Sequence, residues 1–564
     1  MISEKNKIIA VLVLAFVLRV TGIGFGLPYL YHQDEPIIAN HAMSIGVGGW
    51  NTHFFVIPPF TIYFFFILQG IYFIVGKFLG VFNTASDFAL AFIRDPSAVY
   101  LLGRFFIGII FGTATVWALW WGAKRFFNEK IAFWAAFFLA ILPFHVQHSH
   151  YIYADIPLTF AVTLIFFVLL AMSENPSWIS YIRFGLLMGW AASIKYTALY
   201  FVPVILVAHG VAHRKDSLKG QSFLKLILSG ICCVLVFLLF APFSILDWKH
   251  FLQQIFHQGG AEGFVGWTHH AIYSIVGGSG IFFSALSILG LFILARCSRK
   301  KMIIACAFIF LYYFVNVYFS QRFARYMLPI MPALALLSAI ALQELSQFFK
   351  KRRLLGIFII AALCLELLLP SIYSDALFLK TDTRTECVRW FHDNVKAGSV
   401  VVVDNRFFGP HLRVSAQQIR EKYNLLDGSE KDGARKARLD LMLQALEGEK
   451  TYDVYQMAFT DEQKSGAFLF LRPYVDADWG ALKKIGAQYL IVNYADPEPG
   501  SKNLINAISD KLELARSFSP YLDPVKKTSK DRNASTAAEH LAPELFSRRF
   551  SGPYLEIYRI KEAS

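Results

Sequence analysis

Twelve long apolar stretches constrain the fold of this chain more than any other feature. They cover residues 8–27, 56–80, 99–121, 131–147, 156–173, 181–194, 197–212, 223–243, 272–295, 302–319, 326–345 and 354–372. A helix needs about 20 apolar residues to cross a bilayer, and most of these stretches reach or approach that length. Hydrophobic residues make up 56% of the chain and charged residues only 17%, whereas soluble domains carry roughly 25% charge. The sequence therefore predicts a polytopic α-helical membrane protein.

The charges between the stretches predict which of them cross the membrane. Lys and Arg collect in cytoplasmic loops, and five basic clusters lie at 124–130, 183, 214–225, 296–301 and 350–353. If residues 56–80 crossed the bilayer, all five clusters would face outward. We therefore expect that stretch, which contains Pro58-Pro59 near its start, to form a re-entrant or interfacial pair of helices against the outer leaflet. This leaves about eleven crossings, beginning with a retained signal anchor.

The composition changes after residue 374. Residues 375–564 are charged and mixed, with strand-like runs at 400–404, 489–493 and 554–560 between helix-like segments. We predict a transmembrane domain over 1–374, with an outer loop and juxtamembrane helices over 28–98, and a soluble α/β domain over 375–564. By the charge rule the α/β domain is extracytoplasmic, and the expected location is a bacterial inner membrane.

The net charge of +14 does not indicate a nucleic-acid partner. The basic residues lie in short clusters between apolar stretches, a distribution that membrane topology explains. Five of the six cysteines lie in or beside apolar stretches, so no disulfide framework is predicted. Nucleic acid is therefore not an expected partner.

Three carboxylates lie where the outer ends of helices are expected. Asp34 and Glu35 are adjacent in the first outer loop, and Asp155 precedes the 156–173 stretch. Each acid has an alternative role as a helix cap, because acidic residues and Pro are common at helix starts. Capping leaves one member of the Asp34-Glu35 pair without a role. The functional interpretation is a general base with a hydrogen-bonding neighbour, in a partly dry site at the membrane surface.

Several cations are predicted on the same side as these acids. Charge inside an apolar bundle is costly and usually marks an anionic ligand or a pathway. Lys195 is the strongest candidate, because it lies in a break between two short apolar stretches; the others are Arg104, Arg322 and Arg325. The alternative for each is snorkelling to lipid headgroups, and this is the expected role of Arg19. His145, His148 and His150 match no common zinc spacing, so interfacial hydrogen bonding is favoured for them.

The order of these motifs resembles a known class of membrane enzymes. The matching pieces are Asp34-Glu35, Pro58-Pro59, Arg104 after Leu102-Gly103, the run from His148 to Pro157, Ile194-Lys195-Tyr196-Thr197, Arg325-Tyr326-Met327-Leu328-Pro329, and Asp382-Thr383-Arg384 followed by Trp390. Together they resemble the glycosyltransferases of the GT-C class. Within that class the chain is similar to the protein O-mannosyltransferases and bacterial aminoarabinose transferases of family 39.

The resemblance implies transfer of a sugar from a polyprenyl-phosphate donor to an extracytoplasmic acceptor, with inversion. Asp34 is then the expected base, with Glu35 or Asp155 orienting the acceptor. The cations named above are expected to neutralise the donor phosphate. The expected substrate contacts are His148, His150 and Tyr196. No cofactor is required on this interpretation, although a divalent metal is compatible with the class. The expected partners are the lipid-linked donor, membrane lipid and an acceptor that the sequence does not identify.

Two other functions stay open at this point. The same intramembrane cations suit a transporter or flippase for a lipid-linked or anionic solute, although no internal repeat of the kind common in transporters is visible. The chain also fits an inactive assembly or sensor protein whose outer domain carries the function.

Overall fold

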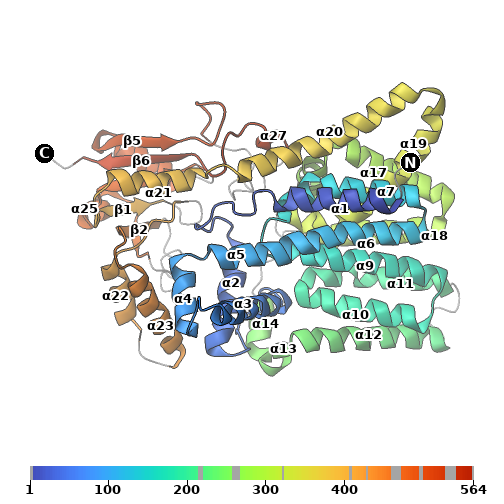
Figure 1. Ribbon diagram of the computed structural model, residues 1–564, viewed down its shortest axis with the longest axis horizontal. Helices are drawn as coiled ribbons and strands as arrows, with labels where there is room; N and C mark the ends of the chain where they lie inside the picture. Colours follow the sequence, from blue (N-terminus) through green and yellow to red (C-terminus); the bar gives the residue numbers. More distant parts are fainter. Residues whose placement is uncertain are drawn as a thin grey trace.

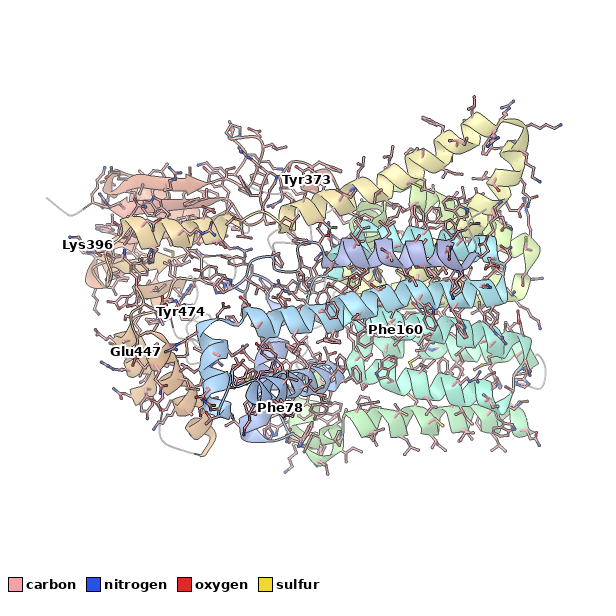
Figure 2. The ribbon with its side chains drawn as sticks, viewed as in Figure 1. Phe78, Phe160, Tyr373, Lys396, Glu447 and Tyr474 are labelled. Atoms are coloured by element: carbon pink, nitrogen blue, oxygen red, sulfur yellow. The ribbon has the colours of Figure 1, made fainter. Side chains whose placement is uncertain are left out.

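The protein consists of a helical bundle and a sheet-containing C-terminal domain at opposite ends of its long axis (Figure 1). The computed structural model describes residues 4–213, 220–256, 267–319, 323–404, 409–426, 430–458, 472–494, 499–527 and 542–561. In Figure 2 the labelled Phe160 lies in the bundle, and Lys396, Glu447 and Tyr474 lie in the C-terminal domain. The chain is an integral membrane protein with a predominantly α-helical fold, as predicted.

Helices follow one another through the first two thirds of the chain. In chain order they are α1 (Glu4–Val20), α2 (Asp34–Gly48), α3 (Phe60–Phe78), α4 (Ala85–Arg94), α5 (Ser97–Gly103), η1 (Arg104–Ile110), α6 (Phe111–Phe126), α7 (Glu129–Ile141), α8 (Pro143–His148), α9 (Asp155–Glu174), α10 (Trp178–Ile194), η2 (Tyr196–Phe201), α11 (Val202–His213), α12 (Gly220–Phe240), α13 (Phe243–Leu246), α14 (Trp248–Phe256), α15 (Trp267–His269), η5 (His270–Val276), α16 (Gly277–Ser279), α17 (Ile281–Cys297), α18 (Arg299–Phe319), η6 (Ala324–Ile330), α19 (Met331–Phe348), η7 (Phe349–Lys351) and α20 (Arg353–Phe378). All twelve apolar stretches contain a helix.

Fewer helices are long enough to cross a membrane than the sequence predicted. Among the described residues, eight helices have the length and apolar composition of a span, or nine if the bent pair 267–279 and 281–297 counts as one. Three stretches predicted to cross form shorter helices: α1 and α10 with 17 residues each and α7 with 13. Helix α7 ends early because Pro143 follows, and proline cannot continue the hydrogen-bond ladder.

Helix α3 runs in a different direction from the bundle. It is strongly foreshortened in Figure 1, whereas α6, α9, α10 and α12 run lengthwise across the picture. It has 19 residues and passes the length test for a span. Its direction agrees with a juxtamembrane helix, and its place in the outer leaflet stays a prediction.

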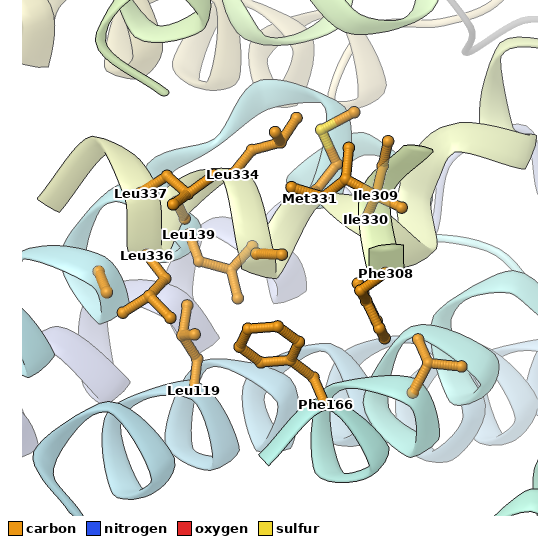
Figure 3. Close-up of a cluster of buried hydrophobic side chains, with 14 of the residues drawn as sticks. Leu119, Leu139, Phe166, Phe308, Ile309, Ile330, Met331, Leu334, Leu336 and Leu337 are labelled. Carbon is orange, nitrogen blue, oxygen red and sulfur yellow. The ribbon is translucent and has the colours of Figure 1, made fainter. Parts of the chain in front are cut away.

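The core of the bundle surrounds α19. In the span that contains this helix 89% of the apolar window is buried, against 6% for α12, so α19 lies inside and α12 at the periphery. Figure 3 shows Leu334, Leu336 and Leu337 of α19 beside Leu139 of α7 and Phe166 of α9. The aliphatic composition of α19 suits this position, because a helix that is apolar on all sides can be buried on all sides.

Helix α10 packs very closely against α12. Gly185 and Gly189 lie one turn apart on α10, and a Cβ atom on either would come within 2.3 Å of a backbone oxygen, that of Ser229 or Cys233. Small residues four positions apart allow two helix backbones to approach closely. The van der Waals packing that results helps membrane helices to associate.

A fully buried arginine joins α1 to α7. Pro143 has no N–H, so the carbonyl of Leu139 has no partner within its helix. Arg19 donates hydrogen bonds to the carbonyls of Leu139 (3.1 Å) and Ala140 (2.9 Å) and contacts Nδ1 of His145 at 2.9 Å. The expectation that Arg19 snorkels to headgroups is therefore wrong. Its side chain completes the interrupted end of α7 from inside the bundle.

The C-terminal domain is built on one six-stranded sheet. The strands are β1 (Val400–Val403), β2 (Asp453–Ala458), β3 (Tyr474–Asp476), β4 (Tyr489–Asn493), β5 (Leu512–Phe518) and β6 (Leu555–Ile560), in the order β3-β2-β1-β4-β6-β5. The first four strands in that order are parallel, and β6 and β5 add an antiparallel edge. The predicted strands at 400–404, 489–493 and 554–560 are confirmed as β1, β4 and β6.

Helices cover both faces of the sheet. They are α21 (Thr383–Asn394), α22 (Ala416–Asn424), α23 (Glu430–Ala445), α25 (Trp479–Lys484) and α26 (Pro499–Ala507), with the short η9 (Ser509–Lys511) before β5. Helix α27 (Ala542–Leu545) lies against α20 instead. Val401 and Val403 face one buried cluster, and Val402 faces the other. Four consecutive valines suit a central parallel strand that is buried on both sides.

The α10–α12 contact yields a stability prediction. Gly185→Ala places a methyl group against the Ser229 carbonyl, so we expect a loss of about 1–3 kcal/mol and a lower thermal midpoint of the detergent-solubilised protein. Gly230→Ala on α12 is the matched control, because no atom lies within 4 Å of the added Cβ. Equal midpoints for the two variants would contradict the close packing.

Candidate active site

Four charged side chains meet at the ends of four elements that are far apart in the sequence. Asp34 begins α2, Asp155 begins α9, Lys195 is the C-cap of α10, and Arg325 is the second residue of η6. Carboxylates are favourable at helix N-termini and cations at C-termini, because of the helix dipole. The local structure therefore favours each of the first three charges where it stands.

The four side chains form one chain of ion pairs. Nη2 of Arg325 lies 3.0 Å from Oδ2 of Asp34, and its Nε lies 4.0 Å from Oδ2 of Asp155. Nζ of Lys195 lies 2.7 Å from Oδ1 of Asp155. We call these four residues the charge network. The structure thus brings together Asp34 and Asp155, which lie 121 positions apart in the chain.

Asp34 is the most accessible member of the charge network. Its side chain is 27% exposed, against 5% for Asp155. Burial alone would raise the pKa of Asp34, but Arg325, His32 and Lys195 outweigh it and hold that pKa below its ordinary value. Asp34 is therefore ionised at neutral pH and able to accept a proton.

Lys195 carries its charge in a confined place. Its side chain is 18% exposed, and Nζ lies 4.3 Å from the centre of the Tyr326 ring. Burial lowers the pKa of Lys195 below its ordinary value, although Asp155 acts in the opposite direction. A cation stacked on an aromatic face and only partly solvated is suited to bind an anion.

Glu35 and Arg104 form a separate and fully buried pair. Two parallel hydrogen bonds join them, Nε to Oε1 at 2.8 Å and Nη2 to Oε2 at 2.7 Å, and neither side chain is exposed. The remaining Nη1 of Arg104 donates to the carbonyls of Ile23 and Phe25. The predicted donor-phosphate role of Arg104 finds no support in these contacts, because each of its guanidinium nitrogens already has a protein partner.

Glu35 likewise makes contacts that hold the backbone. Its Oε1 also accepts a hydrogen bond from the N–H of Ile152 at 3.1 Å. Glu35 therefore connects the start of α2 to the segment that leads to Asp155. These contacts are suited to positioning the backbone beside the charge network.

The predicted substrate contacts His148, His150 and Tyr196 each have hydrogen-bond partners within the protein. His148 is fully buried and hydrogen-bonded to the Tyr153 hydroxyl, and His150 contacts the carbonyls of Val146 and Thr21. Both histidines thus make hydrogen bonds in the protein interior, whereas the sequence favoured hydrogen bonds at the interface. The Tyr196 hydroxyl donates to the Phe55 carbonyl at 3.0 Å. Arg322 lies outside the described residues.

Capping does not account for the two aspartates. The N-cap residue of α2 is Gln33 and that of α9 is Ala154, and neither end has a side-chain cap hydrogen bond. Sequence reasoning missed His32, whose buried ring stacks on Tyr151 at 4.3 Å. Its Nδ1 accepts the backbone N–H of Asp34 at 3.3 Å. The adjacency of His32 to the acidic pair was the available signal.

Comparison with known proteins agrees with this architecture. Residues 99–246 match the family model described as dolichyl-phosphate-mannose-protein mannosyltransferase. The structure is similar to the crystal structure of ArnT from Cupriavidus metallidurans in the apo state, with 15% identity, 90% of this chain and 94% of that chain covered, and a TM-score of 0.53. It is also similar to the crystal structure of ArnT from Cupriavidus metallidurans bound to undecaprenyl phosphate. The identity is 13%, 91% of this chain and 95% of that chain are covered, and the TM-score is 0.52. No curated protein matches the chain.

These likenesses bear on the fold. The GT-C fold predicted from the sequence is confirmed, and so is the resemblance to the mannosyltransferase family. The matched family segment contains Arg104, Asp155 and Lys195. The roles of the individual site residues stay predictions.

The buried pair yields a second stability prediction. Arg104→Ala leaves the Glu35 carboxylate buried without its counter-ion, so we expect a loss of about 3–5 kcal/mol in unfolding free energy. The double variant Glu35→Leu with Arg104→Met removes both charges and should recover part of that loss. Thermal unfolding in detergent measures both.

Arg389→Ala is the control, because Arg389 and Glu386 form an exposed pair on α21 and such pairs contribute roughly 0–1 kcal/mol. A loss for Arg104→Ala no larger than that of the control would refute the positioning role.

Proposed function

We propose that the chain is a glycosyltransferase that moves a sugar from a polyprenyl-phosphate donor to a hydroxyl of an acceptor, with inversion at the anomeric carbon. The charge network is the observation that carries the proposal, since it combines an accessible, ionised carboxylate with two cations in a confined space. The mannosyltransferase description of the matching family model supports the reaction type. The structurally similar ArnT bound to undecaprenyl phosphate supports the donor class.

In the proposed reaction, Asp34 has one task and the two cations have another. Asp34 accepts the proton of the acceptor hydroxyl as its oxygen bonds to the anomeric carbon. The bond between that carbon and the phosphate oxygen breaks, and the polyprenyl phosphate departs with the electron pair. Lys195 and Arg325 neutralise the negative charge that grows on the phosphate. Attack and departure occur on opposite faces of the sugar, which gives inversion.

Asp155 keeps the two cations apart and oriented. Its two oxygens face Lys195 at 2.7 Å and Arg325 at 4.0 Å. When a phosphate arrives, it can share these two cations with Asp155. The proposed mechanism needs no cofactor, because the two side chains already supply positive charge.

The proposal also assigns the site to one face of the membrane. We infer that the charge network and residues 375–564 lie on the extracytoplasmic face of a bacterial inner membrane. The inference rests on the five basic clusters at the other ends of the helices. The C-terminal domain contacts the segment that leads into Asp34, since Arg384 lies 3.8 Å from the centre of the Tyr31 ring. A domain so close to the site is suited to acceptor recognition.

Asp34→Asn tests the base. The amide cannot take the acceptor proton, so we expect sugar transfer to fall by about 10²–10⁴-fold while binding of the polyprenyl-phosphate sugar persists. The measurement is donor consumption by purified protein with candidate acceptors. Asp95→Asn, which changes an exposed carboxylate near α5, is the control and should keep full activity. Transfer by Asp34→Asn at the wild-type rate would remove Asp34 as base, and solute flux into vesicles without any transfer would favour a transporter.

Lys195 gives a prediction for donor affinity at alkaline pH. The ammonium charge of Lys195 is present below the pKa of the group and is lost as pH rises through that pKa. The pKa lies below the ordinary lysine value. Affinity for the donor should therefore fall at a lower pH than it would with an ordinary lysine. Lys195→Arg keeps its charge above pH 12 and should move this loss upward. Affinity for polyprenyl phosphate between about pH 7 and 10.5 measures it. The phosphate itself is doubly charged above roughly pH 7, so an identical alkaline limb in both proteins would exclude Lys195 as its cause.

A further inference from the structure

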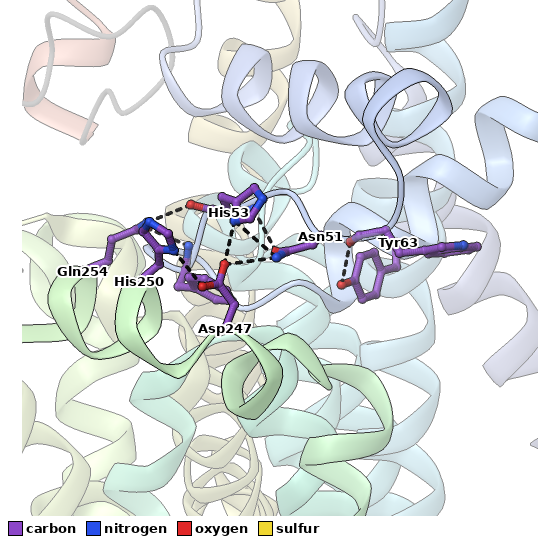
Figure 4. Close-up of polar contacts among 8 residues, drawn as sticks. Asn51, His53, Tyr63, Asp247, His250 and Gln254 are labelled. Carbon is purple, nitrogen blue, oxygen red and sulfur yellow. Dashed lines mark hydrogen bonds and ion pairs between the residues drawn. The ribbon is translucent and has the colours of Figure 1, made fainter. Parts of the chain in front are cut away.

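Figure 4 shows a second group of polar side chains, which includes His53, Asp247 and His250. His53 belongs to the loop between α2 and α3, whereas Asp247 ends α13 and His250 belongs to α14. Nδ1 of His53 lies 2.6 Å from Oδ2 of Asp247, and Nδ1 of His250 lies 2.6 Å from Oδ1 of the same carboxylate. One ligand atom from each residue falls within 4.8 Å of the other two, a condition that this group alone meets among the His, Cys, Asp and Glu side chains of the described ranges.

We propose that His53, Asp247 and His250 form a binding site for a divalent transition metal of the Zn²⁺ type. Two imidazoles and a carboxylate are ligands that Zn²⁺ accepts, with water in the fourth position. Mg²⁺ and Ca²⁺ prefer oxygen ligands, so the two nitrogens select against them. Zinc ligands lie about 2.0–2.2 Å from the metal, which sets neighbouring ligand atoms roughly 3.4 Å apart. The imidazoles and the carboxylate need to separate only slightly from their present contacts.

Surrounding hydrogen bonds hold Asp247 and the backbone around His53 in place. Asn51 donates to Oδ2 of Asp247 at 3.0 Å, and its side-chain oxygen accepts the N–H of His53 at 3.0 Å. Gln254 donates to the His53 carbonyl and accepts the N–H of Phe55, both at 2.8 Å. Such outer contacts orient metal ligands and raise affinity. The loop and α14 are thus already joined on both sides of His53.

The backbone at His53 is also unusual. His53 has φ near +50°, and it is the one residue other than glycine with positive φ in the part of the chain that the structure describes. This conformation is uncommon outside glycine and costs free energy. Here it directs the imidazole toward Asp247.

The exposure of the ligands suits a metal. The Asp247 carboxylate lies between the two imidazoles and also accepts a hydrogen bond from Asn51. The side chains of His53 and His250 are 61% and 51% exposed. An ion can therefore reach them from solvent.

The site would fasten the loop before α3 to α14. Phe55, two residues after His53, accepts the hydrogen bond from Tyr196, next to Lys195. Its ring also lies 5.7 Å from that of Phe251 on α14. A metal at His53 would therefore stiffen one wall beside the charge network without contacting any of its four members. The inference does not depend on the proposed reaction.

Metal binding tests the proposal directly. Full-length protein without a polyhistidine tag is stripped with a chelator, and Zn²⁺ is titrated against a chromophoric competitor. We expect one ion per chain at micromolar or tighter affinity, unaffected by millimolar Mg²⁺. His53→Ala and His250→Ala should each weaken binding at least tenfold. His392→Ala is the matched control, because His392 is exposed and pairs with Asp393 alone at 3.2 Å, and it should bind as the wild type does.

Thermal unfolding separates metal binding from misfolding. In chelator, the two histidine variants should unfold at the wild-type midpoint, since their ligands are exposed. Added Zn²⁺ should then raise the midpoint of the wild type and of His392→Ala only. Zn²⁺ binding of equal strength in all four proteins, or a midpoint of the wild type that Zn²⁺ leaves unchanged, would overturn the site.

Discussion

The bilayer supplies no water to charged groups, and the Glu35–Arg104 pair shows how this chain meets that constraint. The two side chains neutralise each other with two short hydrogen bonds and leave no exposed surface. Their remaining contacts reach the carbonyls of Ile23 and Phe25 and the N–H of Ile152. The pair therefore joins the segment after α1, the start of α2 and the segment before α9. Asp34 adjoins one of these points and Asp155 lies three residues beyond another, so the placement of both aspartates depends on it.

Exposure divides the buried charges of this protein into two kinds. Arg19, Glu35 and Arg104 are completely enclosed, and their contacts satisfy backbone groups or each other. Asp34 and Lys195 are only partly enclosed, and their ion pairs leave surface that a ligand can reach. Breaking an enclosed pair strands a charge, whereas a partly exposed pair can exchange partners. The first kind holds the fold, and the second kind is available for chemistry.

The sequence predicted the elements better than their contacts. Long apolar runs and the four valines of β1 are local patterns, so the helices and three of the strands could be located from them. The stretch 131–147 was predicted to cross as one helix, whereas α7 ends at Ile141, ahead of Pro143. The use of Arg19 to complete that helix end could not be predicted, because its partners lie about 120 positions away. The pairing of Glu35 with Arg104 could not be predicted for the same reason, because 69 positions separate them. His53 and Asp247 are 194 positions apart and share no spacing motif, so only the folded chain reveals them as neighbours.

The junction between the two domains has a consequence for how the protein can move. Helix α20 passes from the bundle toward the C-terminal domain, where Tyr373, labelled in Figure 2, donates to the Arg548 carbonyl at 2.6 Å. Farther along the chain, Thr385 shares a hydrogen bond of 2.8 Å with Tyr31. Tyr31 lies three residues before Asp34. A rotation of the sheet about the end of α20 would therefore pull on the segment that leads into Asp34. The C-terminal domain and the start of α2 are thus mechanically coupled, so a ligand that shifted this domain would also displace Asp34.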